Sequence, residues 1–119
     1  MSPRLRSALS LIAIVLVVSG ATQAWRAWSG DRVGQRIAAA AAPGDILMIA
    51  SDTCPFCAKT RAYFGEHGVV FSECSIERDE ACAARFRAHM SPGTPLLLVR
   101  GQPQVGFDPQ RVAKALGAS

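Results

Sequence analysis

Cys54 and Cys57 are the residues whose spacing most directly predicts chemistry. They form a Cys-x-x-Cys pair just after the apolar run Ile46–Ala50, and Pro55 suits the first position of a helix, where its missing N–H costs nothing. Free N–H groups and the dipole at a helix N-terminus stabilise a thiolate, so Cys54 is the expected nucleophile. Cys57 lies one turn further and is close enough to resolve a mixed disulfide. The pair predicts thiol–disulfide exchange.

A metal site is the alternative use of the same thiols. Cys54 and Cys57 would then be half of a zinc site, completed by Cys74, Cys82 or a histidine. Zinc ribbons carry their second pair with typically two to four residues between the ligands, whereas seven residues separate Cys74 from Cys82. The context therefore favours redox chemistry with no bound metal. A non-catalytic metal- or cluster-binding module remains the alternative outside enzymes.

Cys74 and Cys82 form a second candidate pair. Cys74 ends an expected strand, and Cys82 lies on the core-facing stripe of the helix that follows. A structural disulfide between them would close this strand–helix turn. Four cysteines allow three pairings and the sequence does not choose among them, so free buried thiols remain the alternative.

The segments that must position these residues alternate between helical and extended patterns. Helices are expected over 32–42, 54–67, 78–90 and 109–116, and strands over 46–50, 69–74, 95–99 and 104–106, with a hairpin turn over 100–103. Asp79 and Glu80 would fall in a first helical turn, as the dipole favours, and Asp108 followed by Pro109 is a helix-start signal. The order αβαβαββα predicts one compact α/β domain over residues 31–119.

Two further groups of side chains have structural interpretations. Cys82, Phe86 and Met90 are spaced by four residues and share one helix face, which we expect to pack in the core. His67 and His89 each fall in the last turn of an expected helix. There a surface position that complements the helix dipole is favoured over catalysis.

Residues 1–30 differ from the rest of the chain. Arg4 and Arg6 precede the apolar run Leu11–Val18, and Trp25 and Trp28 follow it. This order fits an uncleaved signal-anchor or transmembrane segment with interfacial tryptophans, and it also fits a cleaved signal peptide. The anchor is favoured, which places the protein in the inner membrane as a single-pass protein with its domain facing the periplasm or exterior. Secretion after signal cleavage is the alternative.

Composition excludes several classes of protein. The 119 residues are 50% hydrophobic and 18% charged, which excludes a disordered chain. The net charge is +4, of which residues 1–30 contribute +3, so residues 31–119 are nearly neutral. No run of lysine or arginine remains to follow a phosphate backbone, and nucleic-acid binding is not expected.

The chain from residue 31 resembles the glutaredoxin branch of the thioredoxin-like superfamily. The resemblance rests on Cys54-Pro55-Phe56-Cys57, on Thr94-Pro95 before a strand, and on Gly106-Phe107-Asp108 before the last helix. It implies a four-stranded mixed sheet flanked by helices and a cis peptide bond before Pro95. It also implies a glutathione groove formed by Thr94, Pro95, Gly106, Phe107 and Asp108, with glutathione as a co-substrate and no bound cofactor.

The resemblance implies a thiol–disulfide oxidoreductase that reduces protein or glutathione mixed disulfides. Ser51 stands where glutaredoxins usually carry a lysine, and Thr94 stands where they usually carry a valine. These differences, with a sequence at Thr94-Pro95 like that of periplasmic disulfide isomerases, are the basis of the alternative, a periplasmic thiol oxidase or isomerase that works without glutathione. Asp108 has a second interpretation as a simple helix cap.

Overall fold

The computed structural model describes residues 2–118 and contains the expected order αβαβαββα. Its elements are α1 (Pro3–Ala40), β1 (Ile46–Ala50), α2 (Pro55–His67), β2 (Ser72–Ser75), α3 (Glu80–Ala88), β3 (Leu96–Val99), β4 (Gln102–Val105) and α4 (Pro109–Ala115). The chain divides into two compact units, Met1–Asp31 and Arg32–Ser119.

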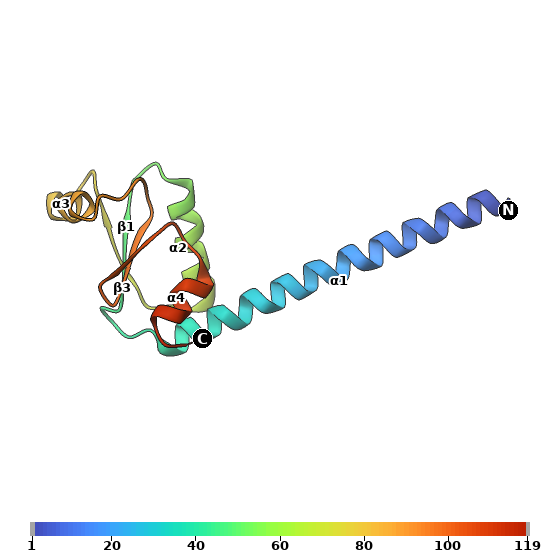
Figure 1. Cartoon of the computed structure of the whole chain (residues 1–119), viewed down its shortest axis with the longest axis horizontal. Coiled ribbons are helices and arrows are strands. Elements are labelled where there is room, and N and C mark those ends of the chain that lie inside the picture. The colour runs from blue at the N-terminus through green and yellow to red at the C-terminus, as the bar shows by residue number, and fades with distance from the viewer. Residues whose placement is uncertain (1, 119) are drawn as a thin grey trace. The chain divides into compact units, whose positions relative to one another are not determined.

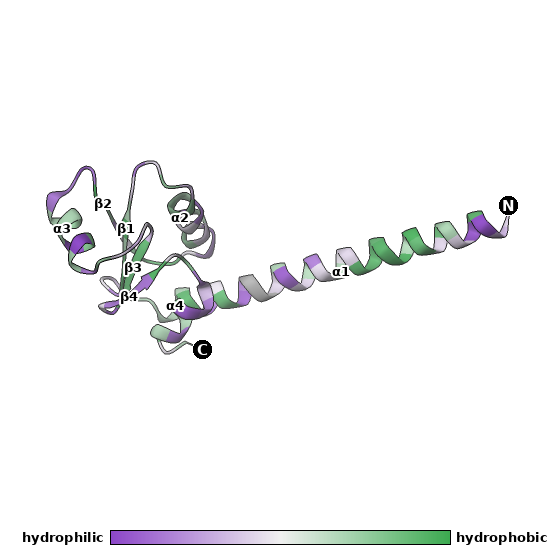
Figure 2. Ribbon diagram, turned by 45° about the horizontal axis from the view of Figure 1, so that its top comes forward, coloured by the Kyte–Doolittle hydropathy of each residue, from purple (hydrophilic) through white to green (hydrophobic). Residues whose placement is uncertain are grey.

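The first unit is the amino-terminal part of α1. This helix contains an 18-residue window with a mean hydropathy of 1.9 and no buried residue, and it is long and apolar enough to cross a membrane. Figure 2 shows the hydrophobic stretch along it. Trp25 and Trp28 are exposed, with ring centroids 5.6 Å apart. The helix is compatible with a membrane anchor or a signal sequence.

The second unit is built on a four-stranded mixed sheet with the order β2-β1-β3-β4 (Figure 2). β1 pairs in parallel with β2, placing Ile49 opposite Cys74, and antiparallel with β3, placing Ile49 opposite Leu96. β4 pairs antiparallel with β3 at the edge of the sheet. Helices α2 and α4 lie on one face and α3 on the other (Figure 1). The predicted four-stranded mixed sheet flanked by helices is confirmed.

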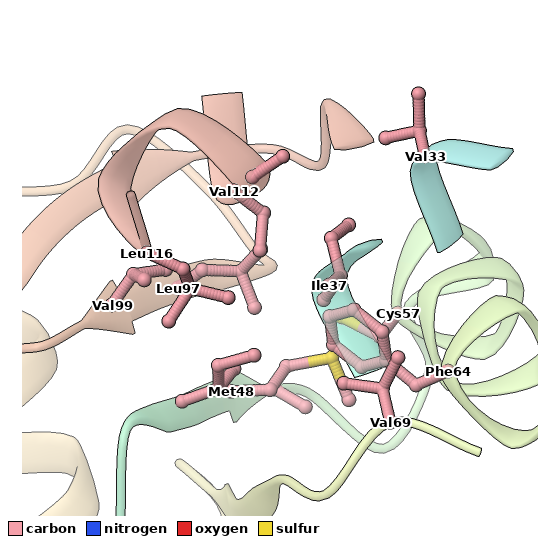
Figure 3. Close-up of a cluster of buried hydrophobic side chains, with 13 residues drawn as sticks. Val33, Ile37, Met48, Cys57, Phe64, Val69, Leu97, Val99, Val112 and Leu116 are labelled. Atoms are coloured by element: carbon pink, nitrogen blue, oxygen red, sulfur yellow. The ribbon is translucent and has the colours of Figure 1, made fainter. Parts of the chain in front are cut away.

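The core lies on both faces because side chains of a strand alternate between them. On the larger side, Ile46 and Met48 of β1 pack with Phe64 of α2 and with residues of β3, α4 and the carboxyl-terminal part of α1 (Figure 3). On the smaller side, Ile49 packs with Leu96 and with Cys82 of α3. Phe64 is fully buried, so it fixes α2 against the sheet, and Cys54 lies at the start of this helix, beyond the carboxyl end of β1.

Several predicted boundaries are wrong for local reasons. β2 begins at Ser72 rather than residue 69, because the Val69 N–H donates to Phe64 O as part of the end of α2. α1 continues unbroken to Ala40, so the separate helix expected over 32–42 is not present. β4 begins at Gln102, after a two-residue turn in which Arg100 and Gly101 both have positive φ. A turn of this kind matches the twist of paired strands.

α3 is also shorter than the expected 78–90, since Asp79 is its N-cap and it ends at Ala88. Met90 lies beyond the helix with φ 49° and is 84% exposed, so its predicted place in the core is wrong. Cys82 is buried and Phe86 is half-buried against the same cluster, as the helical stripe predicted. The predicted core face is wrong only at Met90, which lies after the end of α3.

Candidate active site

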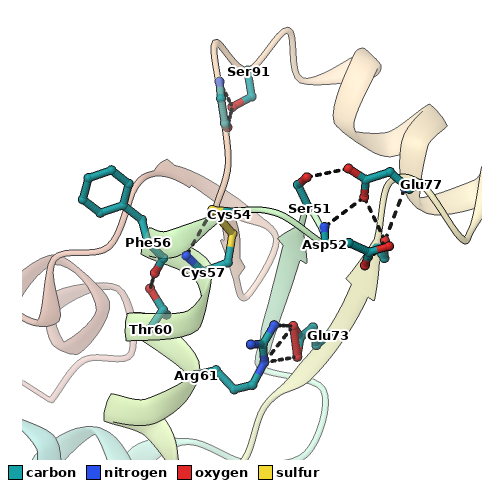
Figure 4. The surroundings of a disulfide bond; sticks show 12 residues. Ser51, Asp52, Cys54, Phe56, Cys57, Thr60, Arg61, Glu73, Glu77 and Ser91 are labelled. Carbon is teal, nitrogen blue, oxygen red and sulfur yellow. Dashed lines mark hydrogen bonds and ion pairs between the residues drawn. A yellow bond between two sulfur atoms is a disulfide. The ribbon is translucent and has the colours of Figure 1, made fainter.

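Cys54 is the N-cap residue of α2 and Cys57 lies in its first turn. Cys54 Sγ accepts a hydrogen bond from the Cys57 N–H at 3.1 Å (Figure 4). The two residues are joined as a disulfide, with their Cα atoms 5.2 Å apart. Cys54 is half-buried, whereas Cys57 is 1% exposed. The sulfur that an incoming substrate can reach is therefore the one beside the helix N-terminus, where an anion is stabilised.

The ends of α2 explain why the sequence places the pair there. Pro55 occupies the first helical position, which needs no N–H donor, and Gly68 ends the helix in the left-handed conformation. The Thr60 hydroxyl donates to Phe56 O at 2.8 Å within the first turns. The Cys54 N–H donates to Ser51 O at 3.3 Å, which folds the loop after β1 into the helix start.

A groove of about 580 Å³ lies beside the pair. Its lining residues are Phe56, Lys59, Thr60, Pro92, Gly93, Thr94, Pro95, Val105, Gly106, Phe107 and Arg111. The Thr94–Pro95 peptide bond is cis, as the resemblance implies. Most of the lining is apolar, and Phe56, between the two cysteines, is 65% exposed. The structure thus brings four of the five expected groove residues together.

Asp108, the fifth, does not line this groove. Its carboxylate accepts the Gln110 N–H at 3.0 Å as the N-cap of α4, and it lies 3.6 Å from Arg111 Nε. The first contact is helix capping, and the second is an ion pair within the first turn of α4. Of the two interpretations of Asp108, its contacts match the helix cap.

Two cationic groove residues were missed by sequence reasoning. Lys59 lies on α2 with its Nζ 5.5 Å from the centroid of the Phe56 ring, and Arg111 lies in the first turn of α4. The spacing of three between Phe56 and Lys59 was a signal for the first, since such residues share a helix face. No sequence signal placed Arg111 there, because α4 comes next to the groove only when the chain folds around the sheet.

An acidic side chain, Glu77, contacts the loop that precedes Cys54 and is not part of the groove lining. The Glu77 carboxylate accepts hydrogen bonds from the Ser51 hydroxyl, from the Asp52 N–H at 3.1 Å and from the Ser75 hydroxyl at 3.0 Å. The Ser51 hydrogen bond is the largest cause of a lowered pKa at Glu77. Ser51, which stands where the family pattern has a lysine, is therefore hydrogen-bonded to an acidic side chain.

The remaining predicted residues lie apart from this chemistry. Cys74 and Cys82 are joined as a disulfide that links β2 to α3, with their Cα atoms 6.0 Å apart. His67 ends α2, with its Nδ1 2.8 Å from Tyr63 O, and His89 is the exposed C-cap of α3. Among residues 2–118, no group of three histidine, cysteine or acidic side chains is arranged to hold a metal ion.

Comparison with solved structures shows that the fold is thioredoxin-like. A mutant of the thioredoxin-like protein BC3987 is 22% identical over 64% of this chain and 99% of that one, with a TM-score of 0.57. The glutaredoxin from Methanosarcina mazei is 21% identical over 62% of this chain and 79% of that one, with a TM-score of 0.52. A buckwheat glutaredoxin–glutathione complex is 12% identical over 75% and 88%, with a TM-score of 0.50.

Within that fold, residues 46–104 match the glutaredoxin family model, which identifies a glutaredoxin-like domain. The matched segment runs from β1 to β4 and includes the cysteine pair and Thr94-Pro95. No curated protein matches this chain. A glutaredoxin domain whose cysteine pair lies at disulfide distance supports a thiol–disulfide redox function.

Proposed function

We propose that this protein is a glutaredoxin-like thiol–disulfide oxidoreductase in which Cys54 is the nucleophile and Cys57 the resolving thiol. The observation that carries the proposal is the position of Cys54 Sγ as the helix cap, within hydrogen-bond distance of the Cys57 N–H, while Cys57 is buried one turn away. The accessible sulfur is the one that the helix N-terminus stabilises as a thiolate.

The reaction follows from this order of exposure. The Cys54 thiolate attacks one sulfur of a substrate disulfide, a mixed disulfide forms, and the other substrate sulfur leaves as a thiolate that takes up a proton. Cys57 loses its proton and attacks Cys54 Sγ, which releases the second substrate thiol and leaves the Cys54–Cys57 disulfide. Two electrons pass to the substrate. Two further thiols, such as two glutathione molecules, return the pair to the dithiol.

The substrates are protein disulfides and glutathione mixed disulfides, held in the groove beside Cys54. The apolar lining around Phe56 and Pro95 suits an extended peptide, and Lys59 and Arg111 suit carboxylates such as the two of glutathione. The buckwheat neighbour is a complex with glutathione, which supports glutathione as co-substrate. Thr94, Gly106 and Phe107 belong to the same groove, and no bound cofactor is needed.

A second candidate is a thiol oxidase or isomerase that acts on protein thiols without glutathione. The contact that favours it is the hydrogen bond from Ser51, which stands where the family pattern has a lysine, to the Glu77 carboxylate. The two candidates share the dithiol chemistry and differ in the regenerating partner. Measuring turnover with glutathione and with a reduced protein substrate separately distinguishes them.

The amino-terminal segment defines where this chemistry takes place. We propose that residues 1–30 anchor the protein in the inner membrane and that residues 31–119 form the redox domain on the periplasmic or exterior side. The support is the apolar window of α1, two arginines before it and two exposed tryptophans after its apolar run. Secretion after cleavage of the segment remains the alternative.

Trapping of the mixed disulfide tests the redox proposal. In the Cys57→Ala variant the mixed disulfide on Cys54 has no resolving thiol, so a glutathione or protein adduct should accumulate and be visible by mass. Cys54→Ala is the matched control, and it should trap little because Cys57 is buried. Equal adducts on both variants, or none on either, would contradict the assignment of Cys54.

A further inference from the structure

Glu77 connects two loops that are far apart in the sequence and meet in front of the cysteine pair. It belongs to the loop between β2 and α3, and its carboxylate binds the Ser51 hydroxyl and the Asp52 N–H in the loop between β1 and α2. These partners lie 26 and 25 residues away along the chain. Figure 4 shows the contacts on the loop that leads directly into Cys54.

The bound loop is the one that sets the position of Cys54. The Cys54 N–H donates to Ser51 O at 3.3 Å, so the loop closes as a turn immediately before α2. The Asp52 N–H lies 3.1 Å from the Glu77 carboxylate. Two residues of standard backbone dimensions separate Asp52 N from Cys54 N, so the Glu77 charge lies within about 10 Å of Cys54 N. A change at Glu77 therefore acts on the nucleophile through both position and charge.

The neighbouring charges are accounted for by other contacts. The pairs are Arg78 with Asp52 at 3.0 Å and Arg61 with Glu73, and the Asp79 carboxylate caps α3. Among the ion pairs of the described residues, none includes Glu77. Hydroxyl and N–H donors stabilise its carboxylate and favour the ionised form.

The segment that carries Glu77 is itself fastened on both sides. The Ile76 N–H donates to Ala50 O at 3.0 Å, and the Glu77 N–H donates to Ser75 Oγ at 3.3 Å. The Cys74–Cys82 disulfide joins β2, just before Ser75, to the first turn of α3. These contacts fix the segment that carries Glu77 without involving the Ser51–Asp52 loop. The Glu77 carboxylate can therefore hold that loop in place.

We propose that Glu77 is a positioning residue for the Cys54–Cys57 pair: through Ser51 and Asp52 it holds the loop that presents Cys54, and its charge makes the pair more reducing. The second effect follows because a nearby negative charge destabilises the Cys54 thiolate of the reduced form, while the disulfide carries no charge. The inference rests on the proposed redox function and adds a residue that tunes it.

Two substitutions in the full-length chain separate the two effects. Glu77→Gln removes the charge and keeps a carbonyl oxygen for the Asp52 N–H, whereas Glu77→Ala removes both. Glu66→Gln, an exposed carboxylate near the far end of α2, is the matched control for a lost charge. The measurements are the alkylation rate of Cys54 against pH, the dithiol–disulfide equilibrium with glutathione, and kcat/KM for a mixed disulfide.

For Glu77→Gln we expect the Cys54 thiolate, and the reduced form of the pair, to be favoured by about two- to four-fold over wild type, as a solvent-screened charge about 10 Å away gives. For Glu77→Ala we expect kcat/KM to fall about ten-fold as well, since a looser loop misplaces the nucleophile. Glu66→Gln should leave all three measurements unchanged.

Unchanged alkylation profiles and redox equilibria in both Glu77 variants would overturn the inference, even if their melting temperatures fell, because support of the fold alone moves neither quantity. The alkylation profile needs no turnover. A wild-type protein without exchange activity would therefore refute the proposed function, while the effect of Glu77 on Cys54 would still be measured.

Discussion

At the residue scale, the Glu77 carboxylate gives the protein a pH-dependent contribution to stability. Its pKa is lowered, mainly by the Ser51 hydrogen bond, so folding favours the ionised form. A depressed folded pKa gives stability that is present above the unfolded value, about 4.3, and is lost as pH falls through the folded value.

Comparison of wild type with Glu77→Gln isolates this contribution, since neighbouring Asp52 and Arg78 are present in both proteins. We expect the difference in unfolding free energy to stay constant from pH 7 down to about pH 5 and to shrink below about pH 4. Denaturant titrations across this range measure it. A difference that does not change with pH would show that the Glu77 contacts form equally with a protonated carboxyl.

Sequence and structure agree best for residues whose role is local. The places of Cys54 and Pro55 at the start of α2 were predictable because the signals lie within four residues. Glu77 was not, because its contacts to Ser51 and Asp52 require β1 and β2 to pair in one particular register. Arg111 was missed for the same reason, since the groove is formed by elements that only the sheet brings together, whereas Lys59 had a local signal in its spacing from Phe56.

At the scale of elements, the Cys74–Cys82 disulfide fastens β2 to α3. It closes a short loop, with a sequence separation of 8. Replacing both cysteines with alanine should lower the free energy of unfolding by about 2–3 kcal/mol, mainly through the freedom gained by the unfolded chain. Urea unfolding measures the change. In excess reductant, which opens both disulfides of wild type and the one left in the variant, the two proteins should be about equally stable. Equal stability of oxidised wild type and the variant would contradict a stabilising bond.

Asp108 is the N-cap of α4, and this capping role can be separated from a role in glutathione binding. Asp108→Ala should cost about 1 kcal/mol of stability, whereas Asp108→Asn should cost little because asparagine caps equally well. If Asp108 acts only as a cap, Asp108→Asn also keeps kcat/KM for a glutathione mixed disulfide. A fall in kcat/KM at unchanged stability would instead place the carboxylate in glutathione binding.

Element order was predictable from hydrophobic patterning, while several ends were not. β1, α2 and α4 carry clear start or stop residues, and their predicted starts match the structure. The ends of β2 and α3 depend on hydrogen bonds that no pattern shows, such as the Val69 N–H to Phe64 O at the end of α2. Met90 was assigned to the core because the helical spacing continued past the true end of α3.

At the scale of the whole molecule, the apolar window of α1 predicts retention in the membrane. The full chain should stay with the membrane fraction after alkaline carbonate washing. Leu16→Arg should release a large share of it, since an arginine at the centre of a span costs about 2.5–3.5 kcal/mol. Leu16→Ile is the control and should behave as wild type. A mature chain that begins at Thr22 or Trp25 would show cleavage and contradict the anchor.

The central claim is that Cys54 and Cys57 form one reversible dithiol–disulfide couple. A redox titration of the full chain against glutathione, with free thiols counted by mass at each cysteine, tests it most directly. We expect both thiols to disappear together in a single two-electron transition between about −230 and −120 mV, while Cys74 and Cys82 stay paired. Thiols at Cys54 and Cys57 that persist across this range, or that titrate independently of each other, would contradict the account.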